Sequence, residues 1–233
     1  RQAKGISTVQ QEIEDVATRI MGHRVVLHGA GRTDAGVHAE GQVANFRTPN
    51  MNIPSRGLRR AINARLPADI LIRSATVVDD QFQASISAIG KTYRYRLFVG
   101  PDRPVGLAGQ VYHYRRHVLD IERMAQAGRR LCGTHDFRGM ATSAEKRENT
   151  VRTIYRCEVA PMGQEIHITV QGNGFLYNMV RNIVGTLIDM GRGRWDKTQI
   201  DTIFATRDRA EAGPTVPPDG LSMVCVHYDD SCK

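Results

Sequence analysis

The pattern of apolar positions near the start of the chain predicts an amphipathic helix. Apolar residues recur there at the spacing of one helical face: Val9, Ile13, Val16 and Ile20. Thr8 precedes the first of them and Gln11 follows three residues later, a spacing that resembles a capping box. We therefore expect a helix that begins after Thr8 and ends at Gly22.

A glycine-rich loop between two strands is the next predicted feature. Val25 to His28 is typical of a short strand, and the alternation from Gln42 to Thr48 predicts a second one. Residues 29–36 lie between them and read Gly-Ala-Gly-Arg-Thr-Asp-Ala-Gly. The loop is therefore expected to connect two strands rather than a strand and a helix.

A basic helix is predicted after Pro54, a residue that suits the first turn of a helix. It continues to a stop near Leu66 and Pro67. Its basic face consists of Arg56, Arg59 and Arg60.

Two further strands complete the first half of the chain. The apolar run from Ile70 to Val78 predicts a buried strand. Residues 91–98 alternate large apolar with cationic side chains, as expected of a strand with one solvated face. Pro101 and Pro104 then close this half.

The second half has similar ingredients, which together predict an α+β fold. We expect helices over residues 121–131, 175–190 and 197–205, and strands over residues 150–159, 165–171 and 221–228. Strands and helices in this order favour a mainly antiparallel sheet flanked by helices. We expect two pseudo-related subdomains, 1–105 and 106–233, that share this sheet and form one catalytic domain.

Composition adds a basic charge to this picture. The 233 residues are 41% hydrophobic and 24% charged, which is ordinary for a globular domain. Lys and Arg number 32 against 24 Asp and Glu, so the formal net charge is +8. Such a charge suits a polyanionic partner, but many basic proteins merely have basic surfaces.

Metal, disulfide and membrane signals are weak. The four cysteines form neither a CxxC pair nor a zinc-finger spacing, so we expect reduced thiols. His113 and His117 stand four residues apart without an acidic residue between them, and we expect no metal there. No apolar run reaches 18 residues and no leader resembles a signal peptide, so we expect a soluble, cytoplasmic protein, with an organelle as the alternative.

The glycine-rich loop allows two chemical interpretations. A phosphate-binding loop is disfavoured because the third glycine of the dinucleotide motif and a Gly-Lys-Ser/Thr sequence are both missing. Alternatively, the glycines bend the chain so that Arg32 and Asp34 project together, and the carboxylate serves as a nucleophile or base. On its own, the same stretch would most simply be an Asx-turn with a solvated arginine.

Three segments change that balance. Residues 31–39, Gly-Arg-Thr-Asp-Ala-Gly-Val-His-Ala, closely resemble the active-site motif of the tRNA pseudouridine synthase A family. Residues 91–95, Lys-Thr-Tyr-Arg-Tyr, resemble its second motif, and residues 174–185 resemble its third. Weaker similarity extends over essentially the whole chain, up to Gly220 and Leu221.

The resemblance implies roles for individual residues. Asp34 matches the carboxylate that attacks the nucleoside, at uracil C6 or at ribose C1′. Tyr93 matches the aromatic residue that stacks on the target base, and it could also take part in removing the proton from C5. Arg181 matches the basic residue that pairs with the carboxylate. Arg32 matches a loop arginine that contacts RNA. We expect the apolar side chains around Arg181 to be core: Phe175, Met179, Ile183, Val184 and Leu187.

The resemblance also implies a substrate and an assembly. It implies a homodimer that isomerises uridines at positions 38 to 40 of the tRNA anticodon arm, without cofactor or metal. We expect tRNA phosphates to contact the basic helix, and we count Leu221 with Arg32 among the RNA-binding residues. A solvated basic face remains the alternative for the helix.

One departure from the family and two rival functions remain. The family normally begins with a β-strand, whereas this sequence begins at what resembles the Arg-Gln after it, so we expect a strand of the first subdomain to be missing. The first rival is a non-catalytic RNA-binding or RNA-folding module. The second is a nucleotide-dependent RNA-modifying enzyme, which the missing cofactor loop disfavours.

Overall fold

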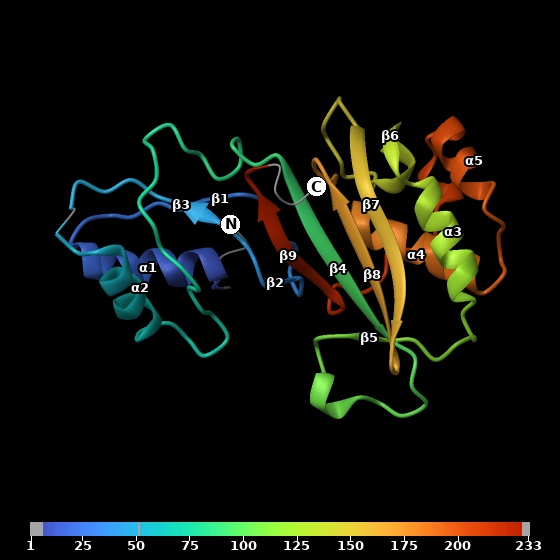
Figure 1. Cartoon of the computed structure of the whole chain (residues 1–233), viewed down its shortest axis with the longest axis horizontal. Helices are drawn as coiled ribbons and strands as arrows, with labels where there is room; N and C mark the ends of the chain where they lie inside the picture. The colour runs from blue at the N-terminus through green and yellow to red at the C-terminus, as the bar shows by residue number, and fades with distance from the viewer. Residues whose placement is uncertain (1–6, 51, 230–233) are drawn as a thin grey trace. The chain divides into compact units, whose positions relative to one another are not determined.

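The computed structural model describes residues 7–50 and 52–229 (Figure 1). It has the predicted α+β class, with helices flanking a mixed sheet. Contacts divide the chain into two compact units, residues 1–31 with 43–87 and residues 32–42 with 88–233. The sequence predicts a different kind of boundary, near residue 105, between two halves of similar make-up. That boundary stays a prediction.

Helix α1 (Val9–Met21) of the first unit has the predicted ends. The Thr8 hydroxyl accepts a hydrogen bond from the Gln11 backbone N–H at 3.2 Å, so one free donor of the first turn is satisfied. Gly22 follows the helix with φ 75°, a left-handed conformation that favours glycine, and its N–H donates to the Thr18 carbonyl. Local sequence therefore determines both ends of α1.

The core of the first unit lies between α1 and helix α2 (Ser55–Asn63). Its buried side chains are Val16, Ala17, Met21, Val25, Leu58 and Ile62. The two predicted strands that flank the glycine loop are reduced to β1 (His28–Gly29) and β3 (Ala44–Asn45), which form an antiparallel pair. The Asn45 side chain then accepts the Ala84 N–H at 2.9 Å, which ties the end of this unit to β3.

The strand predicted over residues 70–78 is wrong. No strand is assigned there, and most of the segment is exposed, including Leu71 and Val77 with 70% and 69% exposure. Its backbone pairs with a side chain instead, because the Asn63 amide donates to and accepts from the main chain of Ile72 at 2.9 and 2.8 Å. An apolar run is buried only where another element covers it.

The second unit is built on a seven-stranded sheet in the order β2-β9-β4-β8-β7-β6, with β5 added to β4. The strands are β2 (His38–Ala39), β4 (Gly90–Phe98), β5 (Tyr112–His113), β6 (Gly133–Asp136), β7 (Val151–Met162), β8 (Glu165–Gly172) and β9 (Leu221–His227). The pairs β2–β9 and β4–β5 are parallel and the others antiparallel. The mainly antiparallel sheet is thus confirmed, although β1 and β3 form a separate two-stranded sheet.

Strand β4 lies between β9 and β8 and shows the predicted alternation. Tyr93, Tyr95 and Leu97 are buried, whereas Arg94 and Arg96 between them are partly exposed. Successive side chains of a strand point to opposite faces, so the apolar set faces the core. The sequence pattern of residues 91–98 therefore predicts the strand and its buried face correctly.

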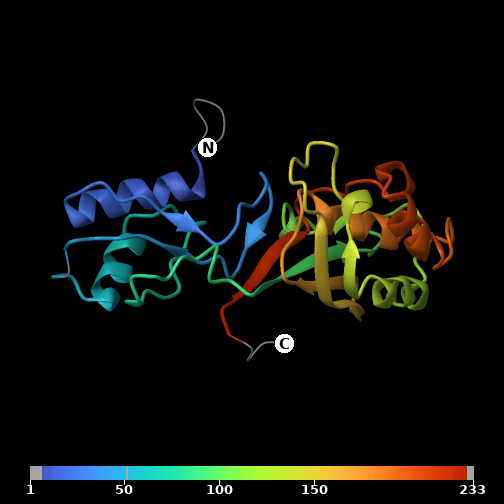
Figure 2. The same cartoon turned by 90° about the horizontal axis from the view of Figure 1, so that it is seen from above.

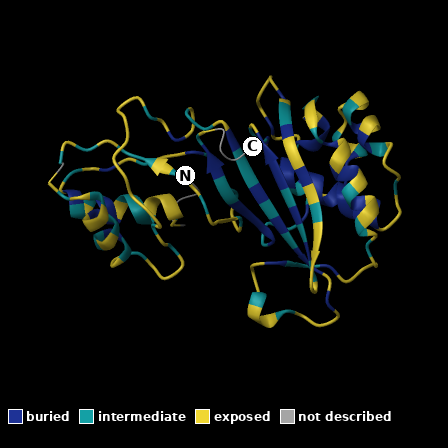
Figure 3. Cartoon of the chain, in the orientation of Figure 1, coloured by how far each residue is buried: buried dark blue, intermediate teal, exposed yellow. Residues whose placement is uncertain are grey.

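Helices α3 (Ile121–Arg130), α4 (Met179–Gly191) and α5 (Gln199–Thr206) complete the second unit (Figures 1 and 2). Helix α3 packs on β7, where a Cβ at Gly128 would lie 3.1 Å from the Cys157 carbonyl. Helix α4 is buried along nearly its whole length, whereas α3 and α5 keep exposed residues (Figure 3). None of the helices that the structure describes is long and apolar enough to cross a membrane.

Candidate active site

The segment that carries Asp34 is held by the edge of the large sheet. His38 and Ala39 of β2 pair with Ser222 and Met223 of β9, and the N–H groups of residues 40 and 41 both donate to the Met223 carbonyl. Met223 in turn lies opposite Tyr93 on β4. The sheet therefore brings the Asp34 loop and Tyr93 together, although they are far apart in sequence.

The loop itself is a tight turn with one required glycine. The Val37 N–H donates to the Asp34 carbonyl at 3.1 Å, and Gly36 has φ 81°. A Cβ at Gly36 would lie 2.9 Å from the Pro218 ring, so both its conformation and its contact favour glycine. This geometry rejects the phosphate-loop interpretation further, because the segment leads into strand β2 and not into a helix.

Arg181 faces the Asp34 carboxylate. Its Nη1 lies 3.8 Å from Asp34 Oδ2, a distance for an ion pair but too long for a hydrogen bond. The guanidinium is oriented by two other acceptors, the Val216 carbonyl at 2.7 Å from Nε and the Asn178 side-chain oxygen at 2.9 Å from Nη1. Asn178 precedes α4 with φ 58°, so a left-handed residue places this acceptor. The Asp34 side chain is 27% exposed and the Arg181 side chain is 16% exposed.

Opposing effects act on the ionisation of Asp34. Burial raises the pKa of this carboxyl, while Arg181 and Arg32 lower it, and the net result is a pKa above the ordinary value. A carboxylate with few solvating groups and a cation nearby is a strong nucleophile that still ionises. Arg181 and Arg32 therefore offset part of the cost of desolvating the Asp34 carboxylate. The Arg181 guanidinium does so without a short hydrogen bond to the carboxylate oxygen.

Tyr93 lies next to this carboxylate and is 9% exposed. Burial, and then the charge of Asp34, raise the pKa of its hydroxyl well above the ordinary range, so the phenol stays protonated at neutral pH. Its ring meets the Phe175 ring edge-on, with centroids 5.0 Å apart and planes at 80°. This packing fixes the orientation of the Tyr93 ring.

A segment before β9, which we call the 213–218 strap, connects Arg181 with the Asp34 loop. Thr215 donates to the side-chain oxygen of the fully buried Asn182 at 2.6 Å, and the next residue supplies the carbonyl that accepts from Arg181. A Cβ at Gly185 would lie 1.8 Å from the Pro214 carbonyl oxygen, so α4 and the strap touch backbone to backbone. The far end of the strap, Pro218, contacts Gly36 as described above.

The sequence did not predict the strap, because backbone carbonyls and close glycine contacts leave no motif at their own positions. The Phe175 contact with Tyr93 was also missed, since Phe175 was expected to be core. Asn178 could have been found, because it lies inside the third motif that includes Arg181. The remaining apolar neighbours of Arg181 are core as predicted: Met179, Ile183, Val184 and Leu187.

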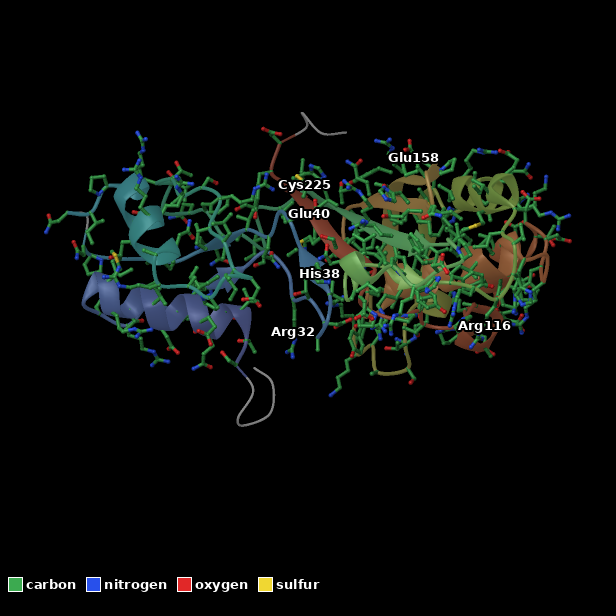
Figure 4. The ribbon with its side chains drawn as sticks, turned by 90° about the horizontal axis from the view of Figure 1, so that it is seen from below. Arg32, His38, Glu40, Arg116, Glu158 and Cys225 are labelled. Atoms are coloured by element: carbon green, nitrogen blue, oxygen red, sulfur yellow. The ribbon has the colours of Figure 1, made fainter. Side chains whose placement is uncertain are left out.

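The residues expected to bind RNA differ in their surroundings. Arg32 is exposed and belongs to the same segment as His38 (Figure 4). Leu221, by contrast, is 5% exposed and lies opposite Tyr95 at the start of β9. In the first unit, Arg59 donates to the Arg73 carbonyl at 3.1 Å. Its neighbours Arg56 and Arg60 are exposed on α2.

Metal-ligand residues do not gather in the part of the chain that the structure describes: it contains no group of three or more His, Cys, Asp or Glu side chains able to hold an ion. His113 lies on β5, and its Nε2 is 2.9 Å from the Gly100 carbonyl. The site therefore consists of a carboxylate, two guanidinium groups and a phenol. Such a set can perform nucleophilic chemistry.

The comparisons with known proteins agree with this chemistry. The family model described as tRNA pseudouridine synthase matches residues 1–85 and 127–229. A tRNA pseudouridine synthase A of Geobacillus kaustophilus (strain HTA426) is 42% identical over 236 residues, covering 98% of this chain and 88% of that protein. The enzyme of the same name from Acinetobacter baumannii (strain SDF) is 40% identical over 229 residues, covering 98% and 86%. The one from Chlamydia trachomatis serovar L2b (strain UCH-1/proctitis) is 39% identical over 223 residues, covering 95% and 83%. The chain therefore belongs to the tRNA pseudouridine synthase family.

Proposed function

We propose that this isomerase converts uridine to pseudouridine at positions 38 to 40 of the tRNA anticodon arm, with Asp34 as the nucleophile. The observation that carries the proposal is the arrangement of Asp34, which is partly desolvated, 3.8 Å from Arg181 and adjacent to the buried Tyr93. The positions within the tRNA rest on the resemblance of the three motifs.

The reaction moves atoms within the nucleoside and imports none. Asp34 adds to uracil C6 or to ribose C1′, and the bond between N1 and C1′ breaks. The uracil turns, C5 bonds to C1′, and C5 loses its proton while N1 gains one. The aspartate is then released, so neither an oxidant nor a cofactor is required.

Tyr93 and Arg181 have distinct roles in this scheme. The Tyr93 ring stacks on the target base, and such stacking is worth about 1–3 kcal/mol, comparable with the cost of extruding a base from a helix. Because its hydroxyl stays protonated, it can accept the C5 proton only if it passes its own proton on. Arg181 keeps Asp34 ionised before the attack.

Substrate binding relies on the basic charge of the chain. The formal charge of +8 favours a polyanion, and Arg32, Arg56, Arg59 and Arg60 are proposed to contact tRNA phosphates. Leu221 is buried opposite Tyr95, so we propose that it supports the site by packing in the core and does not contact RNA directly. The resemblance also supports a homodimer acting in the cytoplasm.

The test is to incubate the protein with unmodified tRNA transcripts and to map pseudouridine by site-specific chemical modification. Transcripts with cytidine at positions 38 to 40 are the matched control and should remain unmodified. Pseudouridine elsewhere in the tRNA would contradict the proposed positions. Tight tRNA binding without any conversion would favour the non-catalytic RNA-binding module instead.

A further inference from the structure

Three cations to which the proposed mechanism gives no role gather around one short segment beside Tyr93. Lys91 on β4 lies opposite Gly172, the last residue of β8. The Arg152 side chain passes close to Gly174, where a Cβ would lie 3.6 Å from its Nε. Arg147 donates from Nη1 to the Phe175 carbonyl at 3.1 Å. All three therefore border residues 172–175.

The loop that presents Arg147 is held by a buried carboxylate. The Glu145 side chain is 4% exposed, and it accepts the Tyr177 N–H at 2.8 Å and the Arg147 N–H at 3.0 Å. One of its oxygens also lies 3.4 Å from the Arg147 guanidinium. The guanidinium nevertheless stays 57% exposed, so the loop is fixed while its charge remains accessible.

The positive charge of this cluster exceeds its negative charge. Among the described residues, no hydrogen bond or ion pair reaches the Lys91 ammonium. In the described part of the chain, the Arg152 side chain donates hydrogen bonds to backbone carbonyls alone, those of Asn149 at 3.2 Å and Val151 at 2.6 Å. Burial, together with the charge of Arg147, lowers the pKa values of both Lys91 and Arg152. Like charges held together in this way are stabilised by a bound anion.

The cluster lies next to the base-stacking position. Lys91 precedes Tyr93 by two residues on the same strand, so their side chains share a face and their Cα atoms are about 7 Å apart. The Phe175 ring that packs on Tyr93 belongs to the residue whose carbonyl holds Arg147. An anion bound there would thus be adjacent to a base stacked on Tyr93.

We propose that Lys91, Arg147 and Arg152 form a binding site for a phosphate of the RNA strand next to the target uridine. This inference rests on the proposed function, because it uses Tyr93 as the base-stacking residue. Guanidinium groups suit this anion since they bind phosphate oxygens with two parallel donors. The site would hold the strand while the target base leaves its stack.

The test pairs a change in the protein with a change in the RNA. An anticodon stem-loop with a neutral methylphosphonate at either phosphate flanking the target uridine is compared with the unmodified stem-loop by filter binding. The wild-type protein should lose about tenfold to a hundredfold in affinity at one of the two positions, the range for a charge-assisted hydrogen bond. Arg147→Gln/Arg152→Gln should show no such loss.

The salt dependence provides the second readout. The double variant should flatten the slope of log affinity against log salt by about 0.7 for each phosphate of a single strand that it no longer neutralises. Arg156→Gln is the matched control, because Arg156 is an exposed arginine of β7 that pairs with Glu158. It should keep the wild-type slope and the wild-type response to the methylphosphonate.

The outcomes separate this inference from the proposed function. If the wild-type protein forms pseudouridine but the double variant is as sensitive to the methylphosphonate as wild type, the phosphate site is overturned. If the wild-type protein binds the stem-loop without converting it, the proposed function fails, while the binding comparison still decides on the site. Should the double variant unfold, Lys91→Met and Arg147→Lys replace it. Lys91→Met must then reduce the methylphosphonate effect and Arg147→Lys must retain most of it.

Discussion

Replacing Arg181 by methionine should shift the acid limb of the curve of kcat/KM against pH toward neutral pH. The arginine lowers the pKa of Asp34 against the effect of burial, so its removal leaves the burial effect and the weaker influence of Arg32. Asp34 then holds its proton to a higher pH and is unreactive below it. The direction of the shift follows from the geometry of the ion pair alone.

The magnitude can be worked out from the distance between the two groups. Unit charges 3.8 Å apart attract by about 1 kcal/mol at the dielectric constant of water and about 4 kcal/mol at an effective value of about 20. One pKa unit corresponds to about 1.36 kcal/mol, so the expected shift is about 1 to 3 units. The partial exposure of Asp34 favours the lower part of this range.

The assay is kcat/KM for pseudouridine formation as a function of pH, since its acid limb reports the ionisation of the free enzyme. Arg181→Lys is the control, because it retains the charge while losing the fork that bonds Val216 and Asn178. Its acid limb should stay near that of wild type even if its rate falls. An unchanged acid limb in Arg181→Met would refute the electrostatic role of Arg181.

Four further predictions follow from the site and from the basic helix. Burial raises the pKa of Asp34 in the folded chain above its value in the unfolded chain. Between these two pKa values the folded chain binds more protons than the unfolded chain, so the free energy of unfolding falls as pH rises through that window. The melting temperature of Asp34→Asn should therefore exceed that of wild type at neutral pH, and the difference should disappear near pH 4, where Asp34 is protonated. A variant that melts below wild type at neutral pH would contradict the desolvation argument. Tyr93→Phe should keep stacking and lose only the hydroxyl, whereas Tyr93→Leu loses both, so single-turnover rates separate the two roles; full activity in both variants would make Tyr93 a core residue only. Thr215→Val removes the 2.6 Å hydrogen bond that ties the 213–218 strap to α4, and kcat should fall about tenfold with a smaller change in KM; an equivalent change at an exposed threonine of α5 should have no effect. Replacing Arg59 and Arg60 by glutamine should flatten the salt slope of tRNA binding by about one to two units and weaken all tRNAs alike, and an unchanged slope would identify a solvated face.

Much of the fold could be predicted from sequence wherever the determining interactions are local. Thr8, Gln11 and Gly22 specify both ends of α1 through hydrogen bonds to their own helix. The alternation of residues 91–98 specifies β4 and its buried face. Such features depend on neighbours within a few residues, so the pattern alone contains the information.

Features that depend on distant partners could not be predicted. The run over residues 70–78 has the composition of a buried strand, but it is exposed because no strand pairs with it among the described residues. Strands β2 and β5 are two residues long, and each exists only through a parallel partner strand. Nothing in His38 or Tyr112 indicates those pairings.

The candidate site shows the same division. Asp34, Tyr93 and Arg181 were proposed from three motifs, and the structure places them side by side. The groups that orient them were missed, since the Val216 carbonyl and the Thr215 hydroxyl act through a segment without a recognisable pattern. The candidate side chains could thus be proposed from the sequence, whereas the groups that position them required the three-dimensional arrangement.

The most direct test of the account is a single-turnover comparison of wild type and Asp34→Asn on unmodified tRNA transcripts, with tRNA affinity measured in parallel. The amide keeps the shape of the side chain and loses the nucleophile, so pseudouridine formation should disappear while affinity stays within a few fold of wild type. Pseudouridine formation by Asp34→Asn at a rate near that of wild type would contradict the assignment of Asp34 as the nucleophile.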